Sequence, residues 1–102
     1  MNKMVVKGRE RLIRGKLNSF SELPIEKQNI FKKIKEAINK HINCDVHIFG
    51  SYNHGYWDEE SDYDVVVFNQ NYINISNLIR EEVGVKIDIM FASDNVGYIA
   101  IP

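Results

Sequence analysis

The sequence predicts a small α/β (α+β) domain, a mixed β-sheet with helices packed on one face. Three observations predict this class. A long helical pattern is followed by three apolar segments of strand type, and a shorter helical pattern separates the last two. The 102 residues are enough for one hydrophobic core and too few for two. Apolar residues make up 44% of the chain and charged residues 26%, which are globular values and exclude a disordered or fibrous protein.

Residues 1–20 are expected to form a basic N-terminal arm ahead of a single domain at residues 21–102. The apolar residues of the arm follow neither helical nor strand periodicity, and Gly8 and Gly15 interrupt any regular element, so at most a short strand or helical turn is expected. The arm is suited to binding nucleic acid or an acidic protein, although a solvated tail has the same composition. Its basic residues are Lys3, Lys7, Arg9, Arg11, Arg14 and Lys16.

The clearest helix is expected at residues 21–42. Ser21 is suited to cap it, and Pro24 is suited to its first turn. Ile30, Ile34 and Ile38 recur at helical spacing, so they mark the face that packs on the core.

Two strands are expected on either side of a polar, aromatic loop. Residues 44–49 alternate between two faces before Gly50 ends the pattern, and residues 62–68 begin as Asp-Tyr-Asp and continue with β-branched residues. Residues 52–61 between them are expected to form a short helix or a loop.

A second helix is expected after the turn-rich residues 69–73. Asn74 is suited to cap this helix and Gly84 to end it. A third strand then follows at residues 85–91, and the remaining residues are expected to form a tail.

Asp62 and Asp64 carry the first chemical signal. They stand at i and i+2 at the head of a strand, so both carboxylates leave the same face of the sheet. Two carboxylates held this close repel each other, and Mg²⁺, which prefers oxygen ligands, would relieve that repulsion. A solvated strand start is the alternative for an isolated Asp-x-Asp.

Asp88 stands inside the third strand and shares a face with Lys86 and Met90. A carboxylate in an otherwise apolar strand requires a partner. If this strand lies beside the strand of Asp62 and Asp64, three carboxylates converge in a pattern suited to two-metal phosphoryl or nucleotidyl transfer. A salt bridge from Asp88 to a lysine or arginine is the alternative.

Gly50 and Ser51 close the preceding strand in a turn. Glycine allows backbone N–H groups to approach an anion, and the serine hydroxyl adds a donor. Alone, this pair is usually only a turn.

Together these residues resemble the minimal nucleotidyltransferase domain of the DNA polymerase β-like superfamily. Its signature is Gly-Ser, ten residues, Asp-x-Asp and a third Asp on a later strand, which Gly50, Ser51, Asp62, Asp64 and Asp88 match. Short members of this kind resemble the antitoxins that are paired with HEPN-domain toxin ribonucleases.

The resemblance implies a Mg²⁺-dependent enzyme that moves a nucleoside monophosphate onto a hydroxyl acceptor. The expected donor is ATP, which would supply AMP, and the expected acceptor is a tyrosine of a partner HEPN toxin. Gly50 and Ser51 would hold the phosphates of the nucleoside triphosphate. Asp62 and Asp64 would bind two Mg²⁺ ions, and Asp88 would complete one metal site and assist deprotonation of the hydroxyl.

One departure from the family pattern concerns positive charge. Short members usually carry an arginine straight after Gly-Ser and another before the inner glycine, where this chain has Tyr52 and His54. Phosphate neutralisation therefore has to come from elsewhere or be weaker. Tyr52, Tyr56 and Trp57 are suited either to stack on a base or to pack the loop onto the core.

Two further classes of function remain open. One is a non-catalytic module that keeps the fold and neutralises a partner by binding it. The other is a nucleotidyltransferase that acts on RNA or on a small molecule.

Composition excludes other classes of site and suggests a location. Cys44 is the only cysteine, which excludes an intramolecular disulfide and a multi-cysteine zinc site. No apolar run approaches the length of a membrane span, and the charged N-terminus does not resemble a signal peptide, so a cytoplasmic protein without a membrane partner is expected.

Overall fold

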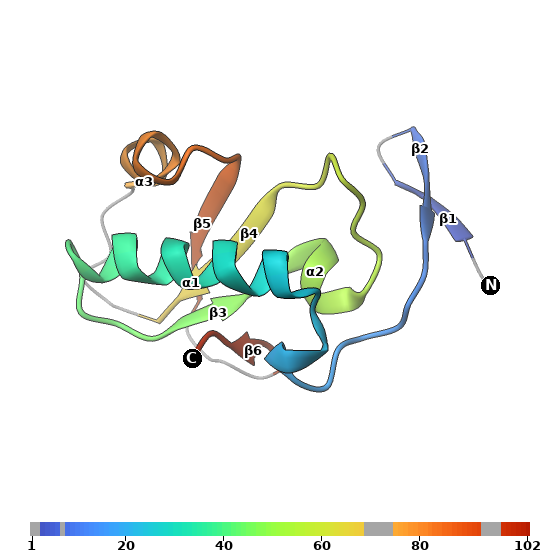
Figure 1. The fold of residues 1–102 in the computed structure, drawn as a ribbon, viewed down its shortest axis with the longest axis horizontal. Coiled ribbons are helices and arrows are strands. Elements are labelled where there is room, and N and C mark those ends of the chain that lie inside the picture. The colour runs from blue at the N-terminus through green and yellow to red at the C-terminus, as the bar shows by residue number, and fades with distance from the viewer. Residues whose placement is uncertain (1–2, 7, 69–74, 93–96) are drawn as a thin grey trace.

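The sheet that holds the molecule together is four-stranded and mixed. The computed structural model describes residues 3–6, 8–68, 75–92 and 97–102, and in it the strand order is β5-β4-β3-β6 (Figure 1). Strand β4 runs parallel to β5 and antiparallel to β3, which also pairs antiparallel with β6. The bounds of these strands are Val46–Ile48 for β3, Tyr63–Val67 for β4, Ile87–Phe91 for β5 and Ile99–Ala100 for β6.

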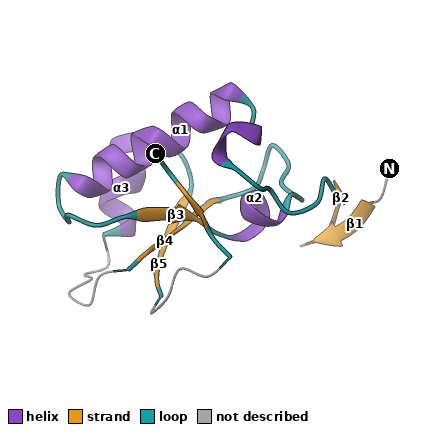
Figure 2. Ribbon diagram, turned by 90° about the horizontal axis from the view of Figure 1, so that it is seen from below, coloured by secondary structure: helices purple, strands orange, loops and turns teal. Residues whose placement is uncertain are grey.

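Helices α1 (Ile25–Asn39) and α3 (Ser76–Val83) cover one face of this sheet, as Figure 2 shows. Alternate residues of β4 point toward them: Tyr63, for example, packs its ring edge-on against Phe31 of α1, with ring centroids 5.2 Å apart. The core forms between the sheet and these helices because this is where the apolar stripe of α1 meets the apolar face of the strands. The predicted α/β class, a small mixed sheet with helices on one face, is confirmed.

The first helix begins later than expected. It starts at Ile25, and Pro24 is its N-cap residue with an extended ψ of 145° instead of a member of its first turn. Leu23 is also extended, as expected of a residue that precedes proline, so the helix cannot begin before Pro24. Ser21 belongs instead to a short 3₁₀ turn, η1 (Phe20–Glu22), and its hydroxyl contacts that of Ser19.

The second helix and the C-terminal segment also differ from expectation. Helix α3 begins at Ser76 and ends at Gly84, as expected of a glycine with φ of 85°, whereas the proposed cap Asn74 lies outside the described residues. The predicted tail contributes the short edge strand β6, which pairs with β3.

The N-terminal residues form a hairpin at one end of the molecule, next to the five-residue helix α2 (Gly50–His54) (Figure 1). Its strands are β1 (Lys3–Val6) and β2 (Arg9–Leu12), which pair antiparallel in a sheet of their own. Downstream of the hairpin, Leu17 and Phe20 are buried in the main core, so hydrophobic burial attaches this segment to the rest of the fold.

Among the described residues, no helix combines the length and the apolar character that crossing a lipid bilayer requires.

Candidate nucleotidyl-transfer site

The three aspartates of the motif lie together on the sheet face that the helices leave uncovered. Strand alternation puts Asp62 and Asp64 on that face, and the parallel pairing of β4 with β5 sets Asp64 directly opposite Asp88. Each aspartate offers a carboxylate oxygen, and these oxygens lie within 4.8 Å of one another. All three residues are half-buried, so the cluster is held by the fold and is open to a ligand.

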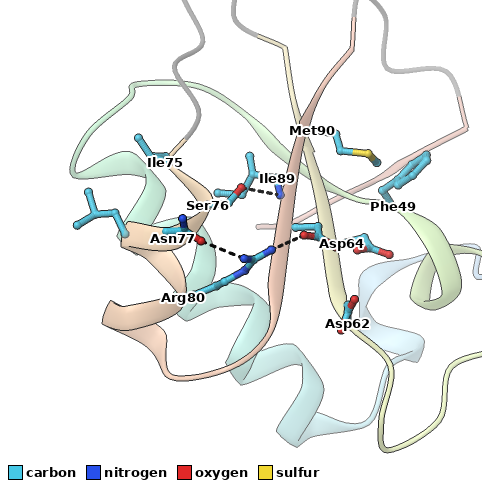
Figure 3. Close-up of a pocket in the computed structure, with 11 residues that line it drawn as sticks. Phe49, Asp62, Asp64, Ile75, Ser76, Asn77, Arg80, Ile89 and Met90 are labelled. Atoms are coloured by element: carbon cyan, nitrogen blue, oxygen red, sulfur yellow. Dashed lines mark hydrogen bonds and ion pairs between the residues drawn. The ribbon is translucent and has the colours of Figure 1, made fainter.

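Arg80 of α3 is the cation at this cluster. Its Nη2 donates to Oδ1 of Asp88 at 2.5 Å, and its Nη1 donates to Oδ1 of Asn77 at 3.0 Å (Figure 3). Its Nε donates to the carbonyl oxygen of Ile87 at 2.6 Å. The salt bridge foreseen as the alternative for Asp88 is therefore present, and so is the convergence of three carboxylates. Sequence spacing gives no signal for this partner, because Arg80 reaches Asp88 through the packing of α3 on β5.

Gly50 and Ser51, which were expected to form a turn, are the first two residues of α2, and this Gly-Ser turn of the helix lies against the same carboxylates. A Cβ atom on Gly50 would come within 2.4 Å of Oδ2 of Asp64, and Gly50 has a φ of 68°. Only glycine fits both the contact and the backbone conformation. The motif therefore begins with glycine because the start of α2 passes directly over the carboxylate of Asp64.

Two cavities adjoin the carboxylates from different sides, and both are lined by Asp62 and Asp64. The larger one, of about 880 Å³, extends toward α3 and has apolar walls that include Phe49, Ile89 and Met90 (Figure 3). The smaller one, of about 300 Å³, extends toward the hairpin and is lined by Gly50, Ser51 and several cations. These lining cations are Arg9, Arg11 and Lys86.

The aromatic residues of the loop are divided between core and surface. Tyr52 is 1% exposed and Trp57 6% exposed, and their rings stack on each other with centroids 5.3 Å apart. Burial raises the pKa of the Tyr52 hydroxyl, which keeps it protonated. Both side chains are core residues, so the interpretation that Tyr52 and Trp57 stack on a base is wrong, and they pack the loop onto the core instead. Tyr56 is half-buried and stacks on the exposed His54.

A second polar cluster fixes the loop that precedes Asp62. Asp58 accepts hydrogen bonds from Nε and Nη2 of Arg9, at 3.0 and 3.2 Å, and from the backbone N–H of Glu60 and the hydroxyl of Ser61. Nε of the buried Arg11 lies 3.4 Å from the same carboxylate. The hydrogen bonds from Arg9 lower the pKa of Asp58 to about 2. The sequence offered no signal for this cluster, because its partners are almost fifty residues apart.

The donor set of the three aspartates fits a hard divalent cation. Asp62 immediately precedes β4, Asp64 lies in β4 and Asp88 in β5, and their oxygens stand within 4.8 Å of one another. All three line the larger cavity, and Asp62 and Asp64 also line the smaller one. Mg²⁺ is usually bound in proteins by one or two carboxylates together with substrate phosphates. Asp62, Asp64 and Asp88 are therefore suited to hold it beside a phosphate-bearing substrate.

Comparison with protein families gives a match over most of the domain. The model of the family described as "Polymerase beta, Nucleotidyltransferase" matches residues 32–99, which include the Gly-Ser turn and all three aspartates. No curated protein and no solved structure shows a significant match to the chain.

Proposed function

The chain belongs to the polymerase beta nucleotidyltransferase family, and from this premise we propose that it transfers a nucleoside monophosphate from a nucleoside triphosphate to a hydroxyl group. ATP is the proposed donor and AMP the transferred group. The proposed acceptor is a tyrosine of a HEPN-type toxin, for which the chain would act as an antitoxin. The observation that carries the proposal is the convergence of Asp62, Asp64 and Asp88 beside the Gly-Ser turn.

The reaction forms one bond and breaks one. The acceptor oxygen bonds to the α-phosphorus, the bond from that phosphorus to the oxygen bridging to the β-phosphate breaks, and pyrophosphate leaves with the electron pair. In this proposal Asp88 would accept the proton of the attacking hydroxyl. Ser51, which is buried and lines the smaller cavity, would donate its hydroxyl to a phosphate.

Asp62, Asp64 and Asp88 would hold Mg²⁺ in this proposal. Bound there, the ion supplies neutralisation of phosphate charge and a lower pKa for the acceptor hydroxyl. The residues themselves would position the substrate, since Asp62 and Asp64 line both cavities and Asp88 lines the larger one.

The test is transfer of label from α-labelled ATP, in the presence of Mg²⁺, to the product of the neighbouring gene, which this proposal expects to be a HEPN-type protein. The isosteric double variant Asp62→Asn/Asp64→Asn should reduce labelling roughly 10²- to 10³-fold or more, as expected when groups that stabilise transition-state charge are removed. Asp45→Asn, which removes an exposed carboxylate outside the site, is the matched control and should label normally.

Other results would identify other functions. Tight binding of the partner without label from any of the four nucleoside triphosphates would mean that the chain is a non-catalytic binding module. Label on RNA in place of protein would mean that the acceptor is a nucleic acid, for which the basic N-terminal residues are the proposed contact. The proposed reaction takes place in the cytoplasm, on an acceptor that is not bound to a membrane.

A further inference from the structure

The site described above does not yet include a side chain that would neutralise the phosphates of a nucleoside triphosphate. The family pattern places arginines at the positions of Tyr52 and His54. Tyr52 points into the core, where it also stacks on Tyr63 at a centroid distance of 5.1 Å, so this position cannot present any group to the cavity. His54 is exposed, stacks on Tyr56, and does not line either cavity next to the carboxylates.

Three cations line the smaller cavity together with the Gly-Ser turn, and two of them are already engaged. Arg9 is held by both carboxylate oxygens of Asp58 and lies 3.1 Å from Glu60. Arg11 is buried, donates to Oγ of Ser61 at 3.2 Å and lies beside Asp58. Their charges are largely neutralised by the loop that they hold in place.

Lys86 differs from these arginines. It is exposed, it lines the same cavity, and in the part of the chain that the structure describes no carboxylate comes within ion-pair distance of it. Its backbone is nonetheless fixed, because its carbonyl oxygen accepts a hydrogen bond from the N–H of Tyr63 at 2.9 Å. The ladder begins where Tyr63 pairs with Ile87, so Lys86 and Asp62 each immediately precede that first pair, and both line the smaller cavity.

The shapes of the two cavities determine which part of a nucleotide reaches Lys86. Both cavities are lined by Asp62 and Asp64, so the reacting α-phosphate belongs at that shared edge. The cavity of about 300 Å³ is polar, holds Lys86, which is unpaired among the described residues, beside the Gly-Ser motif, and is at the small end of ligand sites. The cavity of about 880 Å³ includes the apolar side chains that suit a nucleoside or an acceptor. The β- and γ-phosphates therefore belong in the smaller cavity.

We propose that Lys86 binds the β- and γ-phosphates of the donor nucleotide, and so replaces in space the arginine that this chain lacks after Gly-Ser. The inference rests on the function proposed above, since it presupposes a nucleoside triphosphate at this site. An ammonium group on a flexible stem is suited to following the leaving pyrophosphate, and it acts as a point charge on phosphate oxygens.

The experiment compares the binding of AMP and of α,β-methylene-ATP to the full chain by calorimetry in Mg²⁺. Lys86→Met should weaken binding of the triphosphate analogue about tenfold, the loss expected for one hydrogen bond to a charged group, and should leave AMP binding unchanged. Lys86→Arg keeps the charge and should keep most of the affinity. Lys33→Met, which removes an exposed lysine of α1 away from both cavities, is the matched control.

The outcomes separate this inference from the proposed function. Unchanged affinity of Lys86→Met for the triphosphate analogue, with label transfer retained, would overturn the role of Lys86 and leave the function standing. Equal losses for AMP and for the analogue would also overturn it, because the contact would then not be with the terminal phosphates. A wild-type chain that binds neither ligand would overturn the inference and the proposed function together. Lys86 is exposed and forms no ion pair with any residue that the structure describes, so its variants should melt at the wild-type temperature.

Discussion

Two groups of carboxylates have different surroundings: Asp58 in the loop before β4, and the three aspartates in β4, in β5 and at the residue before β4. Asp58 has two arginines, a backbone N–H and a hydroxyl around it. Asp62, Asp64 and Asp88 crowd within 4.8 Å of one another, with Arg80 bound to the last of them. The first arrangement satisfies a negative charge and stabilises the fold. The second places like charges together, which costs stability and is retained where it can serve a ligand.

The largest effect expected from this contrast is on stability. Asp58→Asn removes the charge that Arg9 and the buried Arg11 share, so the free energy of unfolding should fall by about 2 kcal/mol. For a domain of this size the melting temperature should then fall on the order of 10 °C. Asp62→Asn/Asp64→Asn relieves like-charge repulsion and should melt at the wild-type temperature or above it. Calorimetry without Mg²⁺ measures the melting temperatures of both variants. If the double variant melted below Asp58→Asn, the aspartate cluster and not Asp58 would be the group that stabilises the fold.

The lowered pKa of Asp58 predicts that the free energy of unfolding depends on pH. The hydrogen bonds from Arg9 lower the pKa of Asp58 from 3.8 to about 2, so between these values the unfolded chain binds more protons than the folded one. The contribution of Asp58 is therefore complete above about pH 4 and is lost as the pH falls toward 2. Urea unfolding of the wild type and of Asp58→Asn should give free energies that differ at neutral pH and converge near pH 2. A difference that stays constant over this range would show that the charge of Asp58 does not cause it.

The convergence of the three aspartates could be predicted from the sequence because it depends on local rules. Residues at i and i+2 of a strand share a face, and neighbouring parallel strands bring Asp64 opposite Asp88. The glycine of the motif was likewise identified, although its reason, the approach of Asp64 to Gly50, appears only in the structure.

The remaining parts of the site depend on contacts between distant segments. Residue type alone cannot say that Tyr52 points into the core, because an aromatic residue in a loop suits both packing and stacking. The hairpin was not expected as such, and two of its basic residues, Arg9 and Arg11, are bound to the loop before Asp62 through a contact that no periodicity encodes. Tertiary packing also sets Arg80 against Asp88.

The smallest effect concerns Arg80. Like the arginines around Asp58 it is held by several hydrogen bonds, but its partner Asp88 belongs to the cluster of three aspartates. Arg80→Gln removes a positive charge beside the proposed metal ligands. Without Mg²⁺ the variant should melt a few degrees lower, since repulsion among the carboxylates is then less compensated. It should also bind Mg²⁺ about fivefold more tightly, because the guanidinium no longer repels the ion or occupies Asp88. Thermal shift with increasing MgCl₂ measures both quantities.

Lys40→Gln is the matched control, since it breaks an exposed ion pair with Glu82 outside the site and should leave the response to Mg²⁺ unchanged. A weaker response to Mg²⁺ in Arg80→Gln would mean that the arginine holds Asp88 in place for the metal and does not compete with it.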